Sequence, residues 1–375
     1  MSEVTEFLNL GRLNAPYAER LKQAAARVID SGRYLHGPET KALEAELGAM
    51  HGERAADGSL TPRHCVAVSN GLDALRLMLR AYIELGQLAP GDEVIVPANT
   101  YIATVLAITD AGLRPVLVEP EPVTMNLDPQ AARRAITPRT RAIMAVHLYG
   151  IPTLPQVAGV AREHGLLLLE DNAQSIGARA DGRLTGTFGH AAALSFYPTK
   201  NLGALGDAGA LLTADADLAA TVRALANYGS DRRYHNVYQG FNCRMDELQA
   251  ALLRVRLEGL SEDTERRRAA ARAYCRAIDN QAVTAPAVPA GMEPVWHQFV
   301  VRSPRRDALR EYLAAHGVQT DIHYGVPPHL QPCYAALEHG PLPLTEQLAG
   351  EVLSLPIAHV TEADAHDIAL IINKF

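Results

Sequence analysis

Residues 155–175, PQVAGVAREHGLLLLEDNAQS, decide the fold class of this chain of 375 residues. Residues 155–164 have the apolar spacing of an amphipathic helix, Gly165 interrupts them, and residues 166–169 are wholly apolar. A short apolar run bounded by turn residues is typical of a strand buried on both faces. A helix that leads into such a strand is half of the unit from which parallel sheets are built.

The same alternation runs from about residue 65 to residue 213. Short apolar runs predict buried strands at 66–68, 93–96, 115–118, 142–146, 166–169, 192–196 and 209–212. Helix-like segments lie between several of them, at 72–82, 103–111, 129–136 and 155–164. This order predicts an α/β fold with a mostly parallel central sheet flanked by helices. Because ligands of such sheets bind beyond the carboxyl ends of the strands, we expect the site in the polar segments that follow these runs.

The pattern changes near residue 240, where long helical stretches begin at 246–260 and continue through an arginine-rich run to residue 276. A strand at 295–301 and helices at 305–316 and 362–373 follow. We therefore predict a large α/β domain over residues 1–240 and a smaller C-terminal α+β domain over residues 241–375. The N-terminal segment, with a helix at 17–30 and another after Gly37, can pack on the smaller domain. The charged run 262–268 predicts a solvated helix face, and the polar residues 52–63 predict a surface loop.

Composition argues against several classes of function. The formal net charge is −7, with 35 Lys and Arg against 42 Asp and Glu, which disfavours binding to a nucleic-acid backbone. No apolar run approaches the roughly 20 residues that span a bilayer, and the first residues lack the pattern of a signal peptide. The 4 cysteines form no Cys-x-x-Cys pair and the 14 histidines no His-Glu-x-x-His motif, so no metal site is predicted. We expect a cytoplasmic protein without nucleic-acid or membrane partners.

Three residues that follow or end predicted strands are candidates for catalysis or ligand binding. Lys200 lies between an apolar run and a glycine-rich turn, in SFYPTKNLGALGDAG (195–209), and a lysine enclosed by apolar surface can hold a carbonyl as a Schiff base. Asp171 ends a buried strand, where a carboxylate needs a positive partner. Gly71 begins a turn into a helix whose free N–H groups attract phosphate. Taken singly, each also has a plain structural interpretation, as a surface lysine, a turn-capping aspartate and a sterically required glycine.

Taken together, these segments resemble one family closely, the pyridoxal-phosphate (PLP) nucleotide-sugar aminotransferases of fold type I known as the DegT family. The resemblance extends over nearly the whole chain. Its motifs, in order, are GRYLHGPE (32–39), GDEVIVPANTYIAT (91–104), VHLYG (146–150), EDNAQS (170–175), the Lys200 segment and GFNCRMDELQAA (240–251).

The resemblance implies a role for each matching residue. Lys200 would carry PLP as a Schiff base and move the proton between substrate carbon and cofactor, and Asp171 would pair with the pyridine nitrogen. The other implied cofactor contacts are Gln174 at the ring hydroxyl, Ala173 and Tyr101 on the two ring faces, and Ser195, the backbone of Gly71 and Leu72, and Asn242 from a neighbouring subunit at the phosphate. A homodimer with shared active sites follows from the last of these. Many relatives carry Thr or Ser in place of Leu72, so one hydroxyl contact to phosphate is absent here.

Residues 321–331, together with Tyr197, are most similar to the branch of the family that acts on 3-keto-6-deoxy sugars linked to dTDP. Tyr197, His323 and Tyr324 are the candidate sugar-binding residues, although packing in the small domain explains His323 and Tyr324 equally well. Tyr234 and His235 either contact the nucleotide diphosphate or are exposed loop residues, and the second interpretation is preferred.

The resemblance then implies a complete reaction. An amino group would move from L-glutamate to a dTDP-linked 3-keto-6-deoxyhexose, giving a dTDP-3-amino-3,6-dideoxyhexose for glycan biosynthesis. Two alternatives stay open at this point: transamination at C4 of a dTDP-, GDP- or UDP-4-keto-6-deoxy sugar, and a PLP-binding regulatory protein without turnover.

Overall fold

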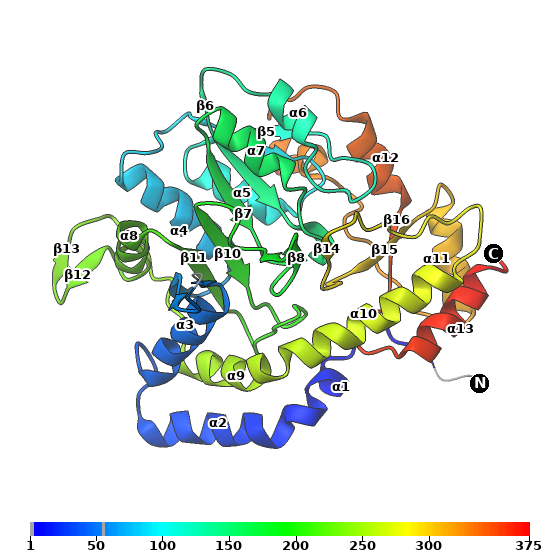
Figure 1. Cartoon of the computed structure of the whole chain (residues 1–375), viewed down its shortest axis with the longest axis horizontal. Helices are drawn as coiled ribbons and strands as arrows, with labels where there is room; N and C mark the ends of the chain where they lie inside the picture. The colour runs from blue at the N-terminus through cyan, green and yellow to red at the C-terminus, as the bar shows by residue number, and fades with distance from the viewer. Residues whose placement is uncertain (1–3, 55–56) are drawn as a thin grey trace.

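A sheet of seven strands forms the centre of the protein (Figure 1). The computed structural model describes residues 4–54 and 57–375. The strands, in sheet order, are β3 (His64–Val68), β11 (Gly209–Thr213), β10 (Ala191–Ser195), β7 (Leu167–Asp171), β6 (Thr140–Val146), β4 (Glu93–Pro97) and β5 (Arg114–Val118). Strand β11 runs antiparallel to both of its neighbours, and the other six strands run in one direction. The predicted α/β fold with a mostly parallel sheet is confirmed.

Helices cover both faces of this sheet, because successive strand side chains point to opposite sides. On one face the apolar residues of the strands pack against α4 (Gly71–Glu84), α5 (Ile102–Asp110) and α8 (Ala216–Ala226). On the other face they pack against α3 (Pro38–Met50), α9 (Glu247–Glu258), α6 (Pro129–Arg134) and α7 (Gln156–Glu163). This two-sided burial explains why the central residues of the strands are apolar.

The N-terminal helices are held by α9, from the second half of the chain. Helix α2 (Ala18–Ser31) lies along α9, and α3 packs on α9 as well (Figure 1). The carboxylate of Glu247, at the start of α9, accepts hydrogen bonds from the N–H groups of Gly37 at 2.9 Å, Glu39 at 2.8 Å and Thr40 at 2.9 Å. Glu247 therefore caps the beginning of α3 across 207 residues of sequence or more.

A second apolar cluster belongs to the C-terminal part of the chain. It joins α10 (Leu260–Ala277), α11 (Arg306–Ala315) and α13 (Glu362–Ile372) with the antiparallel pair β15 (Phe299–Arg302) and β16 (Val352–Leu355). Helix α12 (Pro343–Glu351) connects this cluster to the sheet side through a smaller apolar contact. The separate clusters support the division into domains 1–240 and 241–375, which stays a prediction. Helix α9 lies after residue 240 in sequence but packs against the sheet of the first domain.

The remaining elements are short. They are α1 (Leu10–Asn14), β1 (Glu53–Arg54), β2 (Leu60–Thr61), β8 (Arg179–Ala180), β9 (Arg183–Leu184), β12 (Ser230–Arg232), β13 (His235–Asn236), β14 (Met292–Glu293) and four 3-10 turns at Ala15–Tyr17, Leu148–Gly150, Pro328–Leu330 and Pro332–Tyr334. The hairpin β12–β13 projects beside α8 and carries Tyr234, which is exposed as expected (Figure 1). Within the described part of the chain, no helix combines the length and apolar character that crossing a membrane requires.

Two sequence predictions are corrected by the structure. The strand predicted at 295–301 is present only from Phe299, because Trp296 has a positive φ of 49° that breaks the extended backbone. The charged run at 262–268 is not wholly solvated, since Asp263 and Arg267 are buried. Asp263 bonds the Arg256 guanidinium at 3.1 Å, and Arg267 donates to the carbonyl oxygen of Trp296 at 3.2 Å. The polar stretch 52–63, apart from residues 55–56, which lie outside the described residues, contains the short pair β1–β2.

Candidate active site

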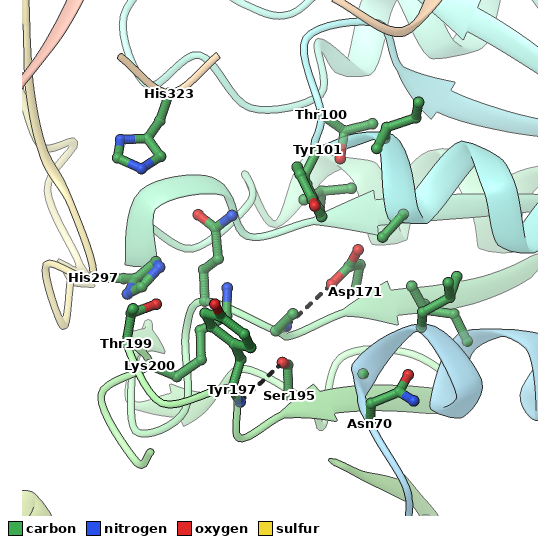
Figure 2. A pocket seen from close by; sticks show the side chains of 18 of the residues that line it. Asn70, Thr100, Tyr101, Asp171, Ser195, Tyr197, Thr199, Lys200, His297 and His323 are labelled. Carbon is green, nitrogen blue, oxygen red and sulfur yellow. Dashed lines mark hydrogen bonds between the residues drawn. The ribbon is translucent and has the colours of Figure 1, made fainter. Parts of the chain in front are cut away.

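A cavity of about 550 Å³ lies beyond the carboxyl ends of β6, β7 and β10 (Figure 2). The beginnings of α4 and α5 and the loop after β10 line it, and four residues from the C-terminal part also line it, namely His297, Gln298, His323 and Tyr324. The predicted site residues in its lining are Gly71, Leu72, Tyr101, Asp171, Ala173, Gln174, Ser195, Tyr197, Lys200, His323 and Tyr324. The fold therefore brings together residues from five segments, at the edge where parallel strands place their ligands.

Asn242 is the one predicted site residue outside this lining. It is exposed, and its backbone forms an isolated β-bridge with Asn227. The expected contact of Asn242 with a cofactor phosphate belongs to a neighbouring subunit and stays a prediction.

Asp171 is buried at the end of β7, with 6% of its surface exposed. Its Oδ1 accepts a hydrogen bond from the N–H of Ala173 at 3.1 Å, and its Oδ2 accepts one from the hydroxyl of Thr104 at 2.8 Å. Burial raises the pKa of Asp171, whereas these two hydrogen bonds and the charge of Lys200 act in the opposite direction. A carboxylate held in this way in an apolar setting suits a cationic partner.

Lys200 lies in the loop after β10, on the same cavity as Asp171 (Figure 2). The backbone N–H of Lys200 donates to the carbonyl of Tyr197 at 2.8 Å, and the backbone N–H of Ala204 donates to the carbonyl of Phe196 at 2.8 Å. These two backbone hydrogen bonds hold the loop in a compact turn. Burial lowers the pKa of Lys200 to about 8, and the charge of Asp171 limits the fall. Near pH 8, Lys200 is therefore an unprotonated amine in a large fraction of the molecules, as attack on a carbonyl requires.

This pKa predicts how fast the protein captures an aldehyde. The free-amine fraction of a group with a pKa of about 8 rises roughly five-fold from pH 7 to pH 8 and levels off above about pH 9. We expect the rate of borohydride-reducible attachment of PLP to the cofactor-free protein to follow the same curve. A rate that keeps rising to pH 10 would instead indicate a solvated lysine.

The start of α4 forms a candidate anion site. Asn70 caps the helix by accepting a hydrogen bond from the N–H of Asp73 at 2.8 Å, so the N–H groups of Gly71 and Leu72 remain at the cavity end of the helix. The Ser195 hydroxyl lies against Gly71, where an added Cβ would be 3.0 Å from its oxygen and 2.6 Å from its Cβ. Free N–H groups, the positive end of a helix and a hydroxyl together suit a phosphate.

Gly71→Ala should damage this site. The new Cβ has no room against Ser195, and overpacking of this kind costs about 1–3 kcal/mol. We expect a lower free energy of unfolding in urea and weaker PLP binding by equilibrium dialysis. In the matched variant Gly159→Ala, in α7, an added Cβ meets nothing within 4 Å, so that variant should be as stable as the wild type or more so. Equal behaviour of the two variants would remove the close-contact argument.

Tyrosine rings and an amide enclose another side of the cavity. Gln174 accepts a hydrogen bond from the N–H of Tyr149 at 2.6 Å, and its Nε2 donates to the Tyr324 hydroxyl at 3.1 Å. The Tyr324 ring lies 5.1 Å from that of Tyr101, which is half exposed on the cavity. Burial raises the pKa of Tyr324, so its hydroxyl stays protonated and can donate a hydrogen bond.

Two histidines, His323 and His297, also reach the cavity (Figure 2). The Nδ1 of His323 lies 2.8 Å from the Ser354 hydroxyl, and burial lowers the pKa of the His323 imidazole. Burial and the nearby charge of Lys200 lower the pKa of His297 as well. Both side chains are therefore neutral at physiological pH.

Sequence reasoning missed His297 and also Thr100 and Thr104. His297 falls inside a segment predicted to be a strand, and a histidine there gives no signal of its own. Thr100 and Thr104 belong to a motif quoted for the family resemblance, but a threonine at the start of a helix is more often a structural residue.

Comparison with known proteins places the chain as a whole in a family. A family model described as the DegT/DnrJ/EryC1/StrS aminotransferase family matches residues 17–373. The chain belongs to this family.

Relatives of this aminotransferase cover almost its entire length. A Saccharopolyspora erythraea protein named erythromycin biosynthesis sensory transduction protein EryC1 is 48% identical, over 96% of both chains. A dTDP-3-amino-3,6-dideoxy-alpha-D-galactopyranose transaminase from Aneurinibacillus thermoaerophilus is 43% identical, over 94% of both chains. Among solved structures, that of S. venezuelae DesV superposes with a TM-score of 0.92 at 44% identity, covering 100% of this chain and 98% of that one.

The cavity of this aminotransferase fits PLP. Asp171 supplies a buried carboxylate with two fixed donors, and Lys200 supplies an amine with a lowered pKa. A Cβ at Gly71 would fill the cradle beside Ser195, and the positive helix end there suits the phosphate. Leu72 contributes only its backbone, as the sequence indicates.

Proposed function

We propose that this aminotransferase moves an amino group from L-glutamate to a dTDP-linked 3-keto-6-deoxyhexose, giving a dTDP-3-amino-3,6-dideoxyhexose for glycan biosynthesis, with PLP as cofactor. The observation that carries the proposal is the convergence of Lys200 and Asp171 on one cavity that also contains Tyr324 and His323. The 43% identity to a transaminase of that product class supports the choice of sugar.

In this proposal every cofactor contact except that of Asn242 falls on a residue of the cavity. Asp171 holds the ring nitrogen, Gln174 the ring hydroxyl, Ala173 and Tyr101 the ring faces, and Ser195 with the N–H groups of Gly71 and Leu72 the phosphate. Bound PLP supplies a ring that withdraws electrons and stabilises negative charge on the substrate carbon next to nitrogen.

The chain itself supplies binding and proton transfer. Lys200 binds the cofactor through Nζ, and as a free amine it takes the proton from the substrate carbon and returns it. Its pKa of about 8 lies near the working pH, which favours both directions of transfer. Asp171 stays ionised opposite the positive ring nitrogen, and the apolar walls of the cavity exclude water.

Tyr197, His323 and Tyr324 are proposed to bind the sugar nucleotide. Tyr197 is half exposed at the cavity and Tyr324 has a protonated hydroxyl, so both can donate hydrogen bonds to sugar or pyrophosphate oxygens. Asn242 from a second subunit completes the phosphate site in a cytoplasmic homodimer. Size measurement of the purified protein by light scattering tests the dimer.

The test of the proposal separates the two possible carbons. Purified protein with PLP and L-glutamate is given 3-keto and 4-keto dTDP-6-deoxyhexoses in separate reactions, and amino-sugar formation is followed by mass spectrometry. We expect conversion of the 3-keto sugar only. Conversion of only the 4-keto sugar would move the reaction to C4, and PLP binding without turnover of any keto sugar would favour a regulatory protein.

A further inference from the structure

Thr104 makes a buried hydrogen bond to the carboxylate at the centre of the site. Its hydroxyl lies 2.8 Å from Asp171 Oδ2, and the threonine is fully buried in the first turn of α5. The only other donor to the Asp171 carboxylate among the described residues is the N–H of Ala173, which bonds Oδ1. Each oxygen of Asp171 therefore has one fixed donor.

The direction of the proton follows from the chemistry of the partners. An ionised carboxylate only accepts, so the Thr104 proton points to Asp171 and not to the carbonyl of Tyr101 at 3.2 Å. The hydroxyl of Thr100, at 2.8 Å from that of Thr104, then donates to it. Two hydroxyls in series thus end on one carboxylate oxygen, and each bond polarises the next.

The same helix turn also places an aromatic residue of the cavity. Tyr101 immediately precedes α5 and lines the cavity, three residues before Thr104. The hydrogen bond to Asp171 therefore fixes the end of β7 relative to the segment that carries Tyr101. Loss of the Thr104 hydroxyl would remove this link and leave the Asp171 carboxylate held only through Oδ1, by the N–H of Ala173.

We propose that Thr104 is a positioning residue that holds the Asp171 carboxylate in place as an acceptor facing the cavity. That the cationic partner of Asp171 is a ring nitrogen of PLP rests on the proposed function. The hydrogen bond between Thr104 and Asp171 does not depend on it. A protonated Asp171 could not balance a positive ring nitrogen, so a residue that favours the ionised form would act through Asp171 on the cofactor.

The groups around Asp171 set the pH range of the effect. Lys200, from the loop after β10, and His147, which follows β6, both lower the pKa of Asp171, while burial raises it. His147 is itself bonded to Glu170 at 2.9 Å, and Tyr324, from the C-terminal part, lines the same cavity as Asp171. Since a hydrogen bond to the charged form lowers a carboxyl pKa, removal of the Thr104 hydroxyl raises the pKa of Asp171 further.

The first experiment uses the protein without cofactor. Thr104→Val removes the hydroxyl at nearly constant shape, Thr104→Ser restores it, and Thr109→Val removes a hydroxyl from the same helix that bonds the Val105 and Leu106 carbonyls and the Tyr334 hydroxyl. Unfolding in urea is measured from pH 5 to pH 8. A buried acid with a raised pKa destabilises the fold as pH rises through that pKa, so the stability gap between Thr104→Val and wild type should widen with pH. The gap for Thr109→Val should stay constant, and Thr104→Ser should match the wild type.

The second experiment measures PLP binding to the same proteins by equilibrium dialysis against pH. We expect the dissociation constant of Thr104→Val to rise about 10- to 100-fold, the range for a lost hydrogen bond to a charged group. The difference in affinity between Thr104→Val and the wild type should be greatest at low pH. As pH is lowered, PLP binding should begin to weaken at a higher pH in the variant than in the wild type. Thr104→Ala replaces the valine variant if that protein does not fold.

A pH-independent stability gap for both threonine variants, or PLP binding by Thr104→Val with the wild-type pH profile, would overturn the inference. Failure of the wild type to bind PLP would instead defeat the proposed function, while the cofactor-free measurement would still report on the bond between Thr104 and Asp171.

Discussion

Lys200→Ala should lower transamination by about 10⁴-fold or more, because one substitution removes both the covalent attachment of the cofactor and the group that moves the proton. The fold should be retained, since the side chain of Lys200 makes no hydrogen bond or ion pair within the described residues. The variant should bind PLP more weakly, and borohydride treatment should leave no cofactor attached to the protein. Mass spectrometry of the reduced protein checks this directly.

A matched control for this result is Lys22→Ala. Lys22 lies on α2, where its side chain is 73% exposed and pairs with Glu19. The control should keep full activity and the reducible link. A reducible adduct retained in Lys200→Ala would move the attachment to another lysine and contradict the assignment.

Asp171→Asn should reduce turnover by about 10²–10³-fold while leaving the cofactor-free protein at least as stable as the wild type. The rate falls because an amide cannot balance the positive charge on the ring nitrogen, and loss of one preorganised electrostatic partner has about this effect. Stability does not fall, because the buried carboxylate has a raised pKa and so costs free energy when it is charged near pH 7. Steady-state kinetics and urea unfolding at pH 7 measure the two quantities.

The neighbouring carboxylate provides the contrasting case. Glu170 accepts hydrogen bonds from the N–H groups of Gly186 and Gly189, both at 2.7 Å, and from His147 at 2.9 Å. Burial raises the pKa of Glu170, but these hydrogen bonds outweigh burial and the pKa is lowered. The ionised carboxylate therefore stabilises the fold, and Glu170→Gln should be less stable than the wild type near pH 7. If Asp171→Asn lost as much stability as Glu170→Gln, Asp171 would be a structural residue.

The sheet was predictable from sequence because its strands are apolar on both faces and short. Each predicted strand from 66–68 to 209–212 is found within two residues of its expected limits. The failures lie where side chains outside the segment decide the backbone. Trp296 turns with a positive φ next to carbonyls that Arg267 binds, and no local pattern of residues 295–301 contains that information.

The site was predictable to the extent that its residues follow strands or belong to recognisable motifs. Lys200, Asp171 and Ser195 meet because β7 and β10 are parallel neighbours. Thr104 and His297 were missed because their importance depends on what they face, an aspartate 67 residues away in the first case and a shared cavity in the second. Contacts of this range are set by the packing of elements and not by any local period.

The cap that Glu247 places on α3 bears on the order in which the protein can fold during translation. A nascent chain that has left the ribosome only as far as residue 240 contains α2 and α3 but neither the carboxylate that binds Gly37, Glu39 and Thr40 nor the helix on which both pack. Domains are generally completed from the N-terminus as synthesis proceeds. Here α2 must wait for α9, so its apolar face stays exposed until the later part of the chain has been made, whereas α3 can already pack on β3 and lacks its cap and its contact with α9.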